Sequence, residues 1–421
     1  MRAPIYVLLV AAVVAPRLGA QSLADRVTAV RDGTVEMTYA SRPDACGDGR
    51  DVVALGRLIT VYPAMRGHGW SDVNCAVGPA RSVVTVRDGL VANVRTHIAG
   101  SRRGTAATTD LGVVPARAAA DYFLTLASTG TSRVASSAVM AAAIADSVDI
   151  WRRVLALARD DNRPPDVRSS SLYWMSGIAP PDAAEQLAML ARSGSDSRSF
   201  REGVIMTLSQ LRDGAGVPTL IAFTQRDADV RWMRERAIFW LGNSNNDRAR
   251  ATLRTLASAD TLALDLRGQA IFALGFLDKQ GENGPFLREL YTRLGSNRLK
   301  DKVIQSVAQL DEAADQRWLA NLVIDTGQPT DLRRQALFWR GQNRSIALGD
   351  LIDLYPRLDS RDLREHYVFV LSQRHESAAV DKLIDLARND PDREIRRKAV
   401  FWLGQSKDPR ATKFIEERIS Q

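Results

Sequence analysis

Residues 394–404 read Glu-Ile-Arg-Arg-Lys-Ala-Val-Phe-Trp-Leu-Gly, and residues 232–242 read Trp-Met-Arg-Glu-Arg-Ala-Ile-Phe-Trp-Leu-Gly. Both fit one phrase: apolar, Arg, two variable residues, Ala, apolar, Phe, Trp, apolar, Gly. The central (Phe) position of this phrase recurs at Tyr173, Met206, Phe239, Phe272, Gln305, Phe338, Phe369 and Phe401. Successive recurrences lie 33, 33, 33, 33, 33, 31 and 32 residues apart. A period of this length predicts a linear array of stacked structural units and argues against a globular enzyme core.

Each unit is predicted to be a pair of helices joined by a polar turn, with the phrase on the first helix. A glycine stands where several first helices should end, a usual position for a left-handed capping residue. These glycines are Gly242, Gly275, Gly341 and Gly404. In the last unit, Asp408 and Pro409 supply the N-cap and the first helical position of the second helix.

The second helices are expected from their apolar periodicity. They are predicted at Trp151–Ala158, Ala183–Arg192, Val217–Phe223, Ala249–Leu256, Pro285–Leu294, Gln316–Val323, Leu348–Leu354, Ala378–Ala387 and Ala411–Ile419. Counting back 33 residues from Tyr173 reaches Met140 in a divergent first unit, so nine units are expected. The polar last helix suits the end of an array, which must present a wettable outer face.

The stretch from Asp392 to Ala411 resembles the HEAT repeat, and most closely the short repeats of phycobilisome-lyase-like bacterial proteins. The resemblance covers about residues 134–421. It implies a mainly α fold, a curved α-solenoid whose second helices line a concave surface that docks partners. It transfers no catalytic or chromophore-binding residue to this chain. The unit around Gln305 departs from the pattern because it is polar at its centre and has Lys300 in place of Arg.

The N-terminus is predicted to be a secretory signal peptide, residues 1–20. Arg2 supplies the positive start, an apolar run of 11 residues extends from Ile5 to Ala15, and Leu18-Gly19-Ala20 forms a small-residue cleavage site. The run is too short to span a bilayer. We therefore expect a periplasmic or secreted protein, with an uncleaved N-terminal membrane tether as the alternative.

Residues 21–115 differ in pattern from the array and are predicted to form a small β-rich domain, with the α-solenoid following at 116–421. Asp88-Gly89 separates two alternating apolar runs, which is a strong hairpin signal. Cys46 and Cys75 are the two cysteines of the chain, and an even pair in an exported protein predicts a disulfide. The resemblance does not extend to this segment.

A basic residue recurs three positions before the alanine of the phrase. These residues are Arg168, Arg201, Arg234, Arg267, Lys300, Arg333, Arg364 and Arg396. The net charge of +8 permits a basic ridge that binds polyanions. Helical geometry instead turns this position toward the packed face, where a charge must be paired. We therefore interpret these residues as a structural ladder that joins each unit to the carbonyls or carboxylates of its neighbour.

Tryptophan also recurs at one position of the phrase, at Trp174, Trp240, Trp339 and Trp402. These rings could form an exposed row that binds glycans or peptides. Since the position lies on the same helical face as the alanine of the phrase, and Trp that recurs in repeats usually fills core, we expect core aromatics.

No metal-binding HExxH motif, phosphate-cradling glycine loop or nucleophile elbow occurs in the sequence. No catalytic, cofactor-binding or metal-ligating residue is therefore predicted, and an enzyme is not expected. The leading hypothesis is an exported scaffold that presents a concave surface to unknown protein partners in the cell envelope. The alternatives are a polyanion or nucleic-acid binder, which the leader argues against, and an enzyme or enzyme accessory with lyase-like repeats.

Overall fold

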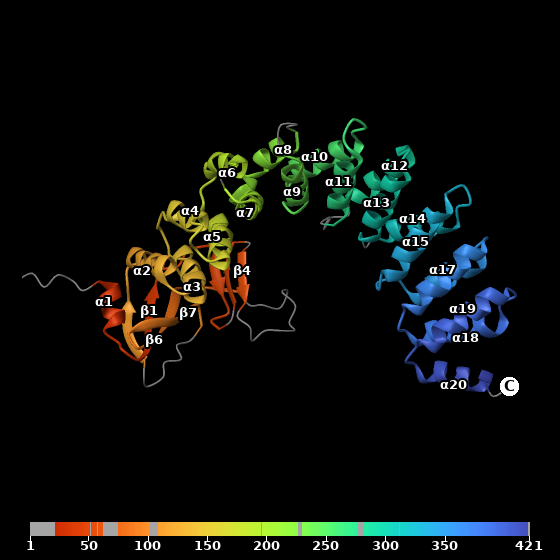
Figure 1. Cartoon of the computed structure of the whole chain (residues 1–421), viewed down its shortest axis with the longest axis horizontal. Helices are drawn as coiled ribbons and strands as arrows, with labels where there is room; N and C mark the ends of the chain where they lie inside the picture. Colours follow the sequence, from red (N-terminus) through yellow and green to blue (C-terminus); the bar gives the residue numbers. More distant parts are fainter. Residues whose placement is uncertain are drawn as a thin grey trace, which may run out of the picture. The chain divides into compact units, whose positions relative to one another are not determined.

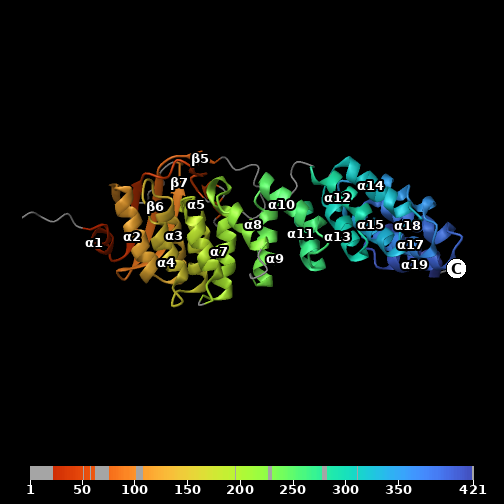
Figure 2. The same cartoon turned by 90° about the horizontal axis from the view of Figure 1, so that it is seen from above.

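The structure, a computed structural model, describes residues 22–50, 52–56, 58–61, 75–100, 108–194, 196–225, 230–276, 282–310 and 312–419. Contacts divide the chain into two compact units, Met1–Ala179 (unit 1) and Pro180–Gln421 (unit 2). Figures 1 and 2 follow the chain from the strands of unit 1 to the last helix of unit 2. The predicted signal peptide at residues 1–20 lies outside the described residues.

Unit 1 contains two four-stranded sheets. One has the strand order β7-β6-β1-β8, with β1 and β8 parallel, and the other has the order β4-β3-β2-β5. The strands are β1 (Gly33–Tyr39), β2 (Ala45–Gly47), β3 (Val52–Leu55), β4 (Leu58–Val61), β5 (Ala76–Val77), β6 (Ala80–Arg87), β7 (Leu90–Ile98) and β8 (Thr108–Val113). The prediction of a β-rich N-terminal segment is thus confirmed.

Two local predictions in unit 1 are also confirmed. The hairpin between β6 and β7 turns at Asp88 and Gly89, both of which have positive φ, as a tight turn that matches strand twist requires. Cys46 and Cys75 form a disulfide with a Cα–Cα distance of 5.3 Å. The bridge joins strand β2 to the residue that precedes β5, and so holds that edge of the second sheet in place.

Five helices belong to the described part of unit 1. They are α1 (Leu23–Thr28), α2 (Ala116–Thr129), α3 (Ser132–Ala143), α4 (Trp151–Arg159) and α5 (Pro165–Ile178). Two of them, α3 and α5, pack on the sheets. Helix α3 packs against β7. The buried Tyr39 hydroxyl donates a hydrogen bond to the carbonyl of Ala141, and Arg42 donates to the carbonyls of Ala143 and Val148. The boundary predicted near residue 115 therefore falls inside unit 1, between β8 and α2.

Unit 2 is a row of helix pairs. Its first helices are α7 (Arg198–Gln210), α9 (Arg231–Gly242), α11 (Leu264–Phe276), α13 (Asn297–Ala308), α15 (Thr330–Gln342), α17 (Arg361–Ser372) and α19 (Arg393–Gly404). Its second helices are α6 (Ala183–Arg192), α8 (Val217–Gln225), α10 (Asp247–Ser258), α12 (Asn283–Arg293), α14 (Ala313–Ile324), α16 (Leu348–Ile352), α18 (Ser377–Asn389) and α20 (Pro409–Ile419). These bounds agree with the predicted helical hairpins. In unit 1, α3 with α4 forms the expected divergent pair.

Consecutive first helices of unit 2 pack extensively on one another, whereas consecutive second helices contact each other much less. The glycine that closes the phrase allows this approach. A Cβ atom on Gly275 would lie 2.5 Å from the Ser306 Cβ and 2.6 Å from the Ser306 Cα of the next first helix. Gly404, in the last first helix, has nothing within 4 Å of such an atom.

The prediction that these glycines are left-handed caps is therefore wrong. Gly242, Gly275, Gly341 and Gly404 all lie in the last helical turn, and none has a positive φ. At Gly242, Gly275 and Gly341 the neighbouring first helix occupies the space that a Cβ would fill, so these positions favour a residue without a side chain.

Candidate functional site

The first helices carry an exposed side opposite their buried stripe. At about 100° per residue, the alanine of the phrase and its apolar partners fall on one side, and the central position points nearly the opposite way. In α19, Ile395, Ala399 and Leu403 are buried, while Phe401 is 56% exposed. In α9, Phe239 is 38% exposed. The central position is thus a surface position that is nonetheless usually aromatic.

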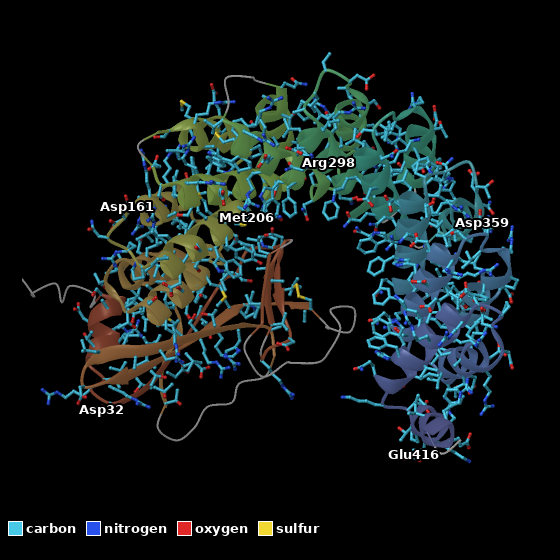
Figure 3. All side chains as sticks on the ribbon, turned by 45° about the vertical axis from the view of Figure 1, so that its right-hand side comes forward. Asp32, Asp161, Met206, Arg298, Asp359 and Glu416 are labelled. Atoms are coloured by element: carbon cyan, nitrogen blue, oxygen red, sulfur yellow. A yellow bond between two sulfur atoms is a disulfide. The ribbon has the colours of Figure 1, made fainter. Side chains whose placement is uncertain are left out.

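The aromatic row of unit 2 consists of Phe239, Trp240, Phe272, Phe338, Trp339, Phe369, Phe401 and Trp402. Figure 3 shows ring side chains projecting from one side of the helices of unit 2. Phe338 and Phe369 stack across α15 and α17, with ring planes 4° apart and centroids 6.5 Å apart. The ring centroids of Phe369 and Trp402 lie 5.3 Å apart, and those of Trp402 and Phe401 lie 5.1 Å apart. The row is therefore continuous across the last three first helices.

His366 is part of the same surface. Its ring lies 5.7 Å from that of Phe369 and 6.5 Å from that of Phe338. Burial, helped by the nearby Arg334 cation, lowers the pKa of His366 below its ordinary value. The side chain is therefore uncharged at neutral pH, so it extends the apolar character of the row.

The four predicted core tryptophans do not all lie in the core. Trp174, in α5 of unit 1, is 3% exposed. Trp240, Trp339 and Trp402 are only half-buried and cover part of the first-helix surface. The prediction needs correction at these three positions, because the residue after the central Phe stands at the border between the buried stripe and the exposed side.

The residues of the predicted Arg ladder lie against the preceding second helix. Nε of Arg168, Arg201, Arg267 and Arg333 donates a hydrogen bond to the carbonyl ten residues earlier, at Ala158, Ala191, Ala257 and Val323 respectively. Each of these carbonyls belongs to the last turn of a second helix, where carbonyls lack helical partners and the dipole favours a cation. The exposed fractions of Arg267 and Arg333 are 6% and 3%.

The other members of the ladder vary this arrangement. Arg364 donates to the carbonyl of Leu358, and Arg396 to that of Asp390. Lys300 places its ammonium 5.0 Å from the ring centroid of Tyr291. Arg234 lies at the same position of α9 and is partly buried. Most of these cations thus donate hydrogen bonds to backbone carbonyls within the array, on the side away from the aromatic row.

Ion pairs join neighbouring first helices beside the aromatic row. Asp265 of α11 accepts from Arg231 of α9 and, at 2.6 Å, from Arg298 of α13. Lys398 of α19 lies 3.3 Å from Glu365 of α17. These pairs are largely exposed, so each contributes little to stability, but together they fix the spacing of the helices that carry the row.

Within the described ranges, no group of three or more His, Cys, Asp and Glu side chains is arranged to hold a metal ion. No helix among those residues combines the length and apolar character needed to cross a membrane.

Sequence reasoning missed the aromatic row as a surface. The signal was present, because the central Phe stands nearly opposite the Ala of the phrase on a helical wheel. The tryptophan that follows the central Phe instead favoured a buried interpretation of these aromatic residues, because recurring Trp usually fills core. Whether a neighbouring helix covers the central position depends on how closely consecutive first helices approach, which only the structure shows.

Comparison with known proteins identifies the repeat. Residues 350–421 match the family model for HEAT repeats. No curated protein sequence matches the chain. Among solved structures, human deoxyhypusine hydroxylase in complex with glycerol is similar at 18% identity and a TM-score of 0.27, over 63% of this chain and 88% of that one.

Two further structures show comparable similarity. The complex of CpcE and CpcF of phycocyanin lyase from Nostoc is similar at 15% identity and a TM-score of 0.26, over 65% of this chain and 96% of that one. Lipovitellin is similar at 12% identity and a TM-score of 0.47, over 88% of this chain and 45% of that one. At these scores the structural similarities carry no argument about function. The match identifies residues 350–421 as HEAT repeats, and the same phrase recurs before them on helix pairs of one design, which supports a HEAT-repeat protein.

Proposed function

We propose that this chain is an exported scaffold that acts by binding a partner protein on the first-helix face of unit 2 rather than by catalysis. The observation that carries the proposal is the aromatic row with its exposed rings at Phe239 and Phe401. Aromatic side chains held in a fixed array are the anchors that dominate protein interfaces, because they bury a large area at low cost in side-chain entropy. Contiguous exposed apolar surface on a folded chain commonly marks such an interface.

The packing of unit 2 supports a binding face that is concave. Its first helices lie close together and its second helices spread apart, and a row of helices bends toward the side on which they approach more closely. The proposed face is therefore on the first helices, whereas the resemblance to the HEAT repeat implied the second helices. Ion pairs between first helices, such as Arg361 of α17 with Asp392 at the start of α19, would keep the face rigid.

Binding through the aromatic row predicts that Phe401→Ala weakens partner binding at least about tenfold, the effect of losing one interface anchor. The side chain is largely exposed, so the variant should unfold at nearly the same temperature as the wild type. The measurement is affinity capture by the full chain from a cell-envelope extract, at low and at moderate salt. The matched control is Met189→Ala on second helix α6, which removes a side chain that is 63% exposed.

A discrete protein captured at moderate salt by the wild type and by Met189→Ala, and lost with Phe401→Ala, is the expected outcome. Equal capture by both variants would place the interface elsewhere and contradict the proposal. Broad binding that disappears as salt rises would instead indicate polyanion-like attraction of the basic chain.

Export of the protein to the periplasm or the medium is supported by the Cys46–Cys75 disulfide, because such bonds persist in oxidising compartments. We expect the protein recovered from the envelope fraction to begin at Gln21, with both cysteines unreactive toward an alkylating reagent until a reductant is added. Intact mass spectrometry measures both properties. A chain that retains residues 1–20 in a membrane fraction would favour the tethered alternative, and reduced thiols would argue against export.

A further inference from the structure

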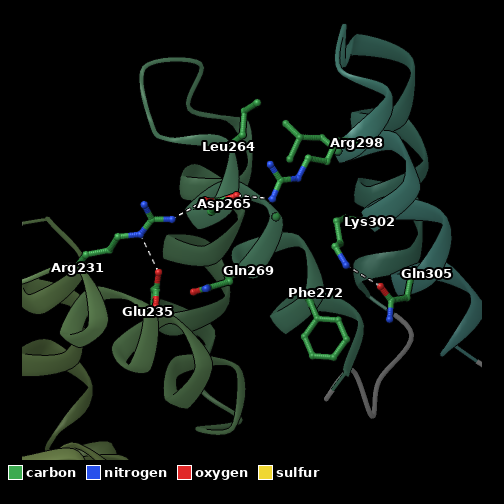
Figure 4. A pocket seen from close by; sticks show the side chains of 11 residues that line it. Arg231, Glu235, Leu264, Asp265, Gln269, Phe272, Arg298, Lys302 and Gln305 are labelled. Carbon is green, nitrogen blue, oxygen red and sulfur yellow. Dashed lines mark hydrogen bonds and ion pairs between the residues drawn. The ribbon is translucent and has the colours of Figure 1, made fainter. Parts of the chain in front are cut away.

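We propose that a hollow among α9, α11 and α13 binds a carboxylate side chain of the partner protein, so that the partner presents an acidic residue beside the apolar groups that meet the aromatic row. The inference rests on the proposed function, whose binding face it makes specific. The hollow has a volume of about 520 Å³. Figure 4 shows it with Arg231 on one side and Arg298 and Lys302 on the other.

A single glycine opens this hollow. Gly268 lies four residues before the central Phe272 of α11 and lines the cavity. The other first helices of unit 2 carry a charged side chain at this position: Glu202, Glu235, Asp301, Arg334, Glu365 and Arg397. Gly268 does not serve close packing, because an added Cβ would meet Lys302 Cγ at 3.6 Å and Leu299 Cδ2 at 3.8 Å, which are ordinary contacts. A glycine inside a helix costs about 1 kcal/mol relative to alanine, so its presence here is consistent with a need for open space.

The charge of the hollow is complementary to an anion. Three cations and two carboxylates line it, which leaves one cation in excess. Asp265 is shared by two arginines, and Glu235 accepts at 2.9 Å from Arg231. Lys302 donates at 3.1 Å to the neutral Gln305 and forms no ion pair with any described carboxylate. The Lys302 ammonium is therefore the cation of the lining that pairs with no lining carboxylate; its electrostatic partner is the neighbouring Asp301, which lies outside the lining.

The remaining donors and acceptors suit a carboxylate carried on a peptide. Arg298 is 68% exposed and uses one terminal nitrogen on Asp265, which leaves its other N–H groups available. The Oε1 atom of Gln269 is buried without a hydrogen-bond partner, so a backbone N–H of a bound segment would satisfy it. Phe272 and Leu264 supply apolar walls. A small inorganic anion would leave both the Gln269 oxygen and these walls unused.

The position of the hollow links it to the aromatic row. It lies at Gln305, where the aromatic side chains are interrupted, between Phe272 of α11 and Phe338 of α15. A partner segment crossing successive first helices would therefore place apolar residues on the row and an acidic residue at the interruption.

The test uses the full chain and a phage-displayed library of random short peptides as the probe. We expect the selected peptides to combine aromatic or aliphatic residues with Asp or Glu. A synthetic peptide of the selected sequence is then measured by fluorescence anisotropy against three variants. Gly268→Glu places in the hollow the residue that α9 and α17 carry at this position, and so supplies the anion from within the chain. Lys302→Met removes the ammonium that donates to Gln305 but keeps most of the aliphatic side chain. Lys413→Met makes the same change at an exposed site on second helix α20.

Gly268→Glu and Lys302→Met are each expected to weaken peptide binding about tenfold or more, and Lys413→Met to leave it unchanged. Thermal unfolding checks that Gly268→Glu remains folded. Selected peptides without acidic residues, or acidic peptides insensitive to both changes in the hollow, would overturn this inference. If Phe401→Ala still abolished binding of those peptides, the proposed function would stand and the carboxylate site alone would be rejected. Failure to select any peptide would count against both proposals.

Discussion

Gly275→Ala is expected to lower the free energy of unfolding of unit 2 by about 1–3 kcal/mol, the usual cost of forcing atoms into a filled space. The new Cβ would lie 2.6 Å from Ser306 Cα and 2.7 Å from the Ser306 carbonyl oxygen. Both are backbone atoms of helix α13, so a side-chain rotation cannot relieve the collision. The two first helices would have to separate, which weakens the contact through which each pair stabilises the next.

The matched control is Gly404→Ala, the same change at the same position of the last first helix. Nothing lies within 4 Å of the added atom there, and alanine favours the helix over glycine by up to about 1 kcal/mol. Denaturant unfolding followed by circular dichroism should therefore shift to a lower midpoint for Gly275→Ala and to an equal or higher one for Gly404→Ala. Equal destabilisation of both variants would contradict the packing explanation and favour the helix-capping role that the sequence predicted for these glycines.

Arg374→Met is expected to destabilise the fold by about 3–5 kcal/mol, the range for removing one member of a buried, charged hydrogen-bond network. The Arg374 side chain is 2% exposed. It donates hydrogen bonds to three carbonyls at the end of the previous first helix and in the turn that follows, those of Gly341, Asn343 and Ile346. It also donates at 2.9 Å to Glu376. Methionine fills much of the volume but satisfies none of these acceptors.

Two measurements separate this role from a general effect of charge. Arg344→Met removes an arginine of the turn after α15 whose side chain is 54% exposed and lies 3.9 Å from the same Glu376, and should change stability by less than about 1 kcal/mol, as expected for an exposed ion pair. In the wild type, the hydrogen bond from Arg374 lowers the pKa of Glu376 to about 2. This pair therefore stabilises the fold above the ordinary pKa of Glu376, and the stabilisation is lost as the pH falls toward 2. The stability gap between wild type and Arg374→Met should narrow in acid, and a pH-independent gap would contradict the assignment.

Much of the local structure could be predicted from the sequence. The 31–33-residue period placed the first helices, the apolar stripes placed the second helices, and Asp88-Gly89 placed a hairpin. The pairing of Cys46 with Cys75 followed from there being two cysteines. The helices and the hairpin depend on residues close together in the chain, so periodicity and turn chemistry were sufficient to predict them. The disulfide could be predicted because two cysteines allow one pairing.

The candidate site could be predicted only in part. A helical wheel turns the ladder arginines, such as Arg267, toward packed surface and the central Phe toward the opposite side. It cannot show whether a neighbouring helix then covers that Phe. The rings of Phe369 and Trp402 meet across a step of about one repeat, at a distance set by how closely α17 and α19 approach.

The repeat, the helix pairs and the class of fold follow from local sequence, because each unit repeats the same pattern of apolar and polar residues. The effects of the variations between units depend on how neighbouring helices pack. Gly275 and Gly404 stand at the same position of the phrase, yet one is pressed against the backbone of the next helix and the other faces open space. Gly268 lines a hollow because no side chain fills the space between it and Lys302 of the next first helix. Such roles are set by a neighbouring helix about one repeat away, and how closely that helix approaches cannot be predicted from the local sequence.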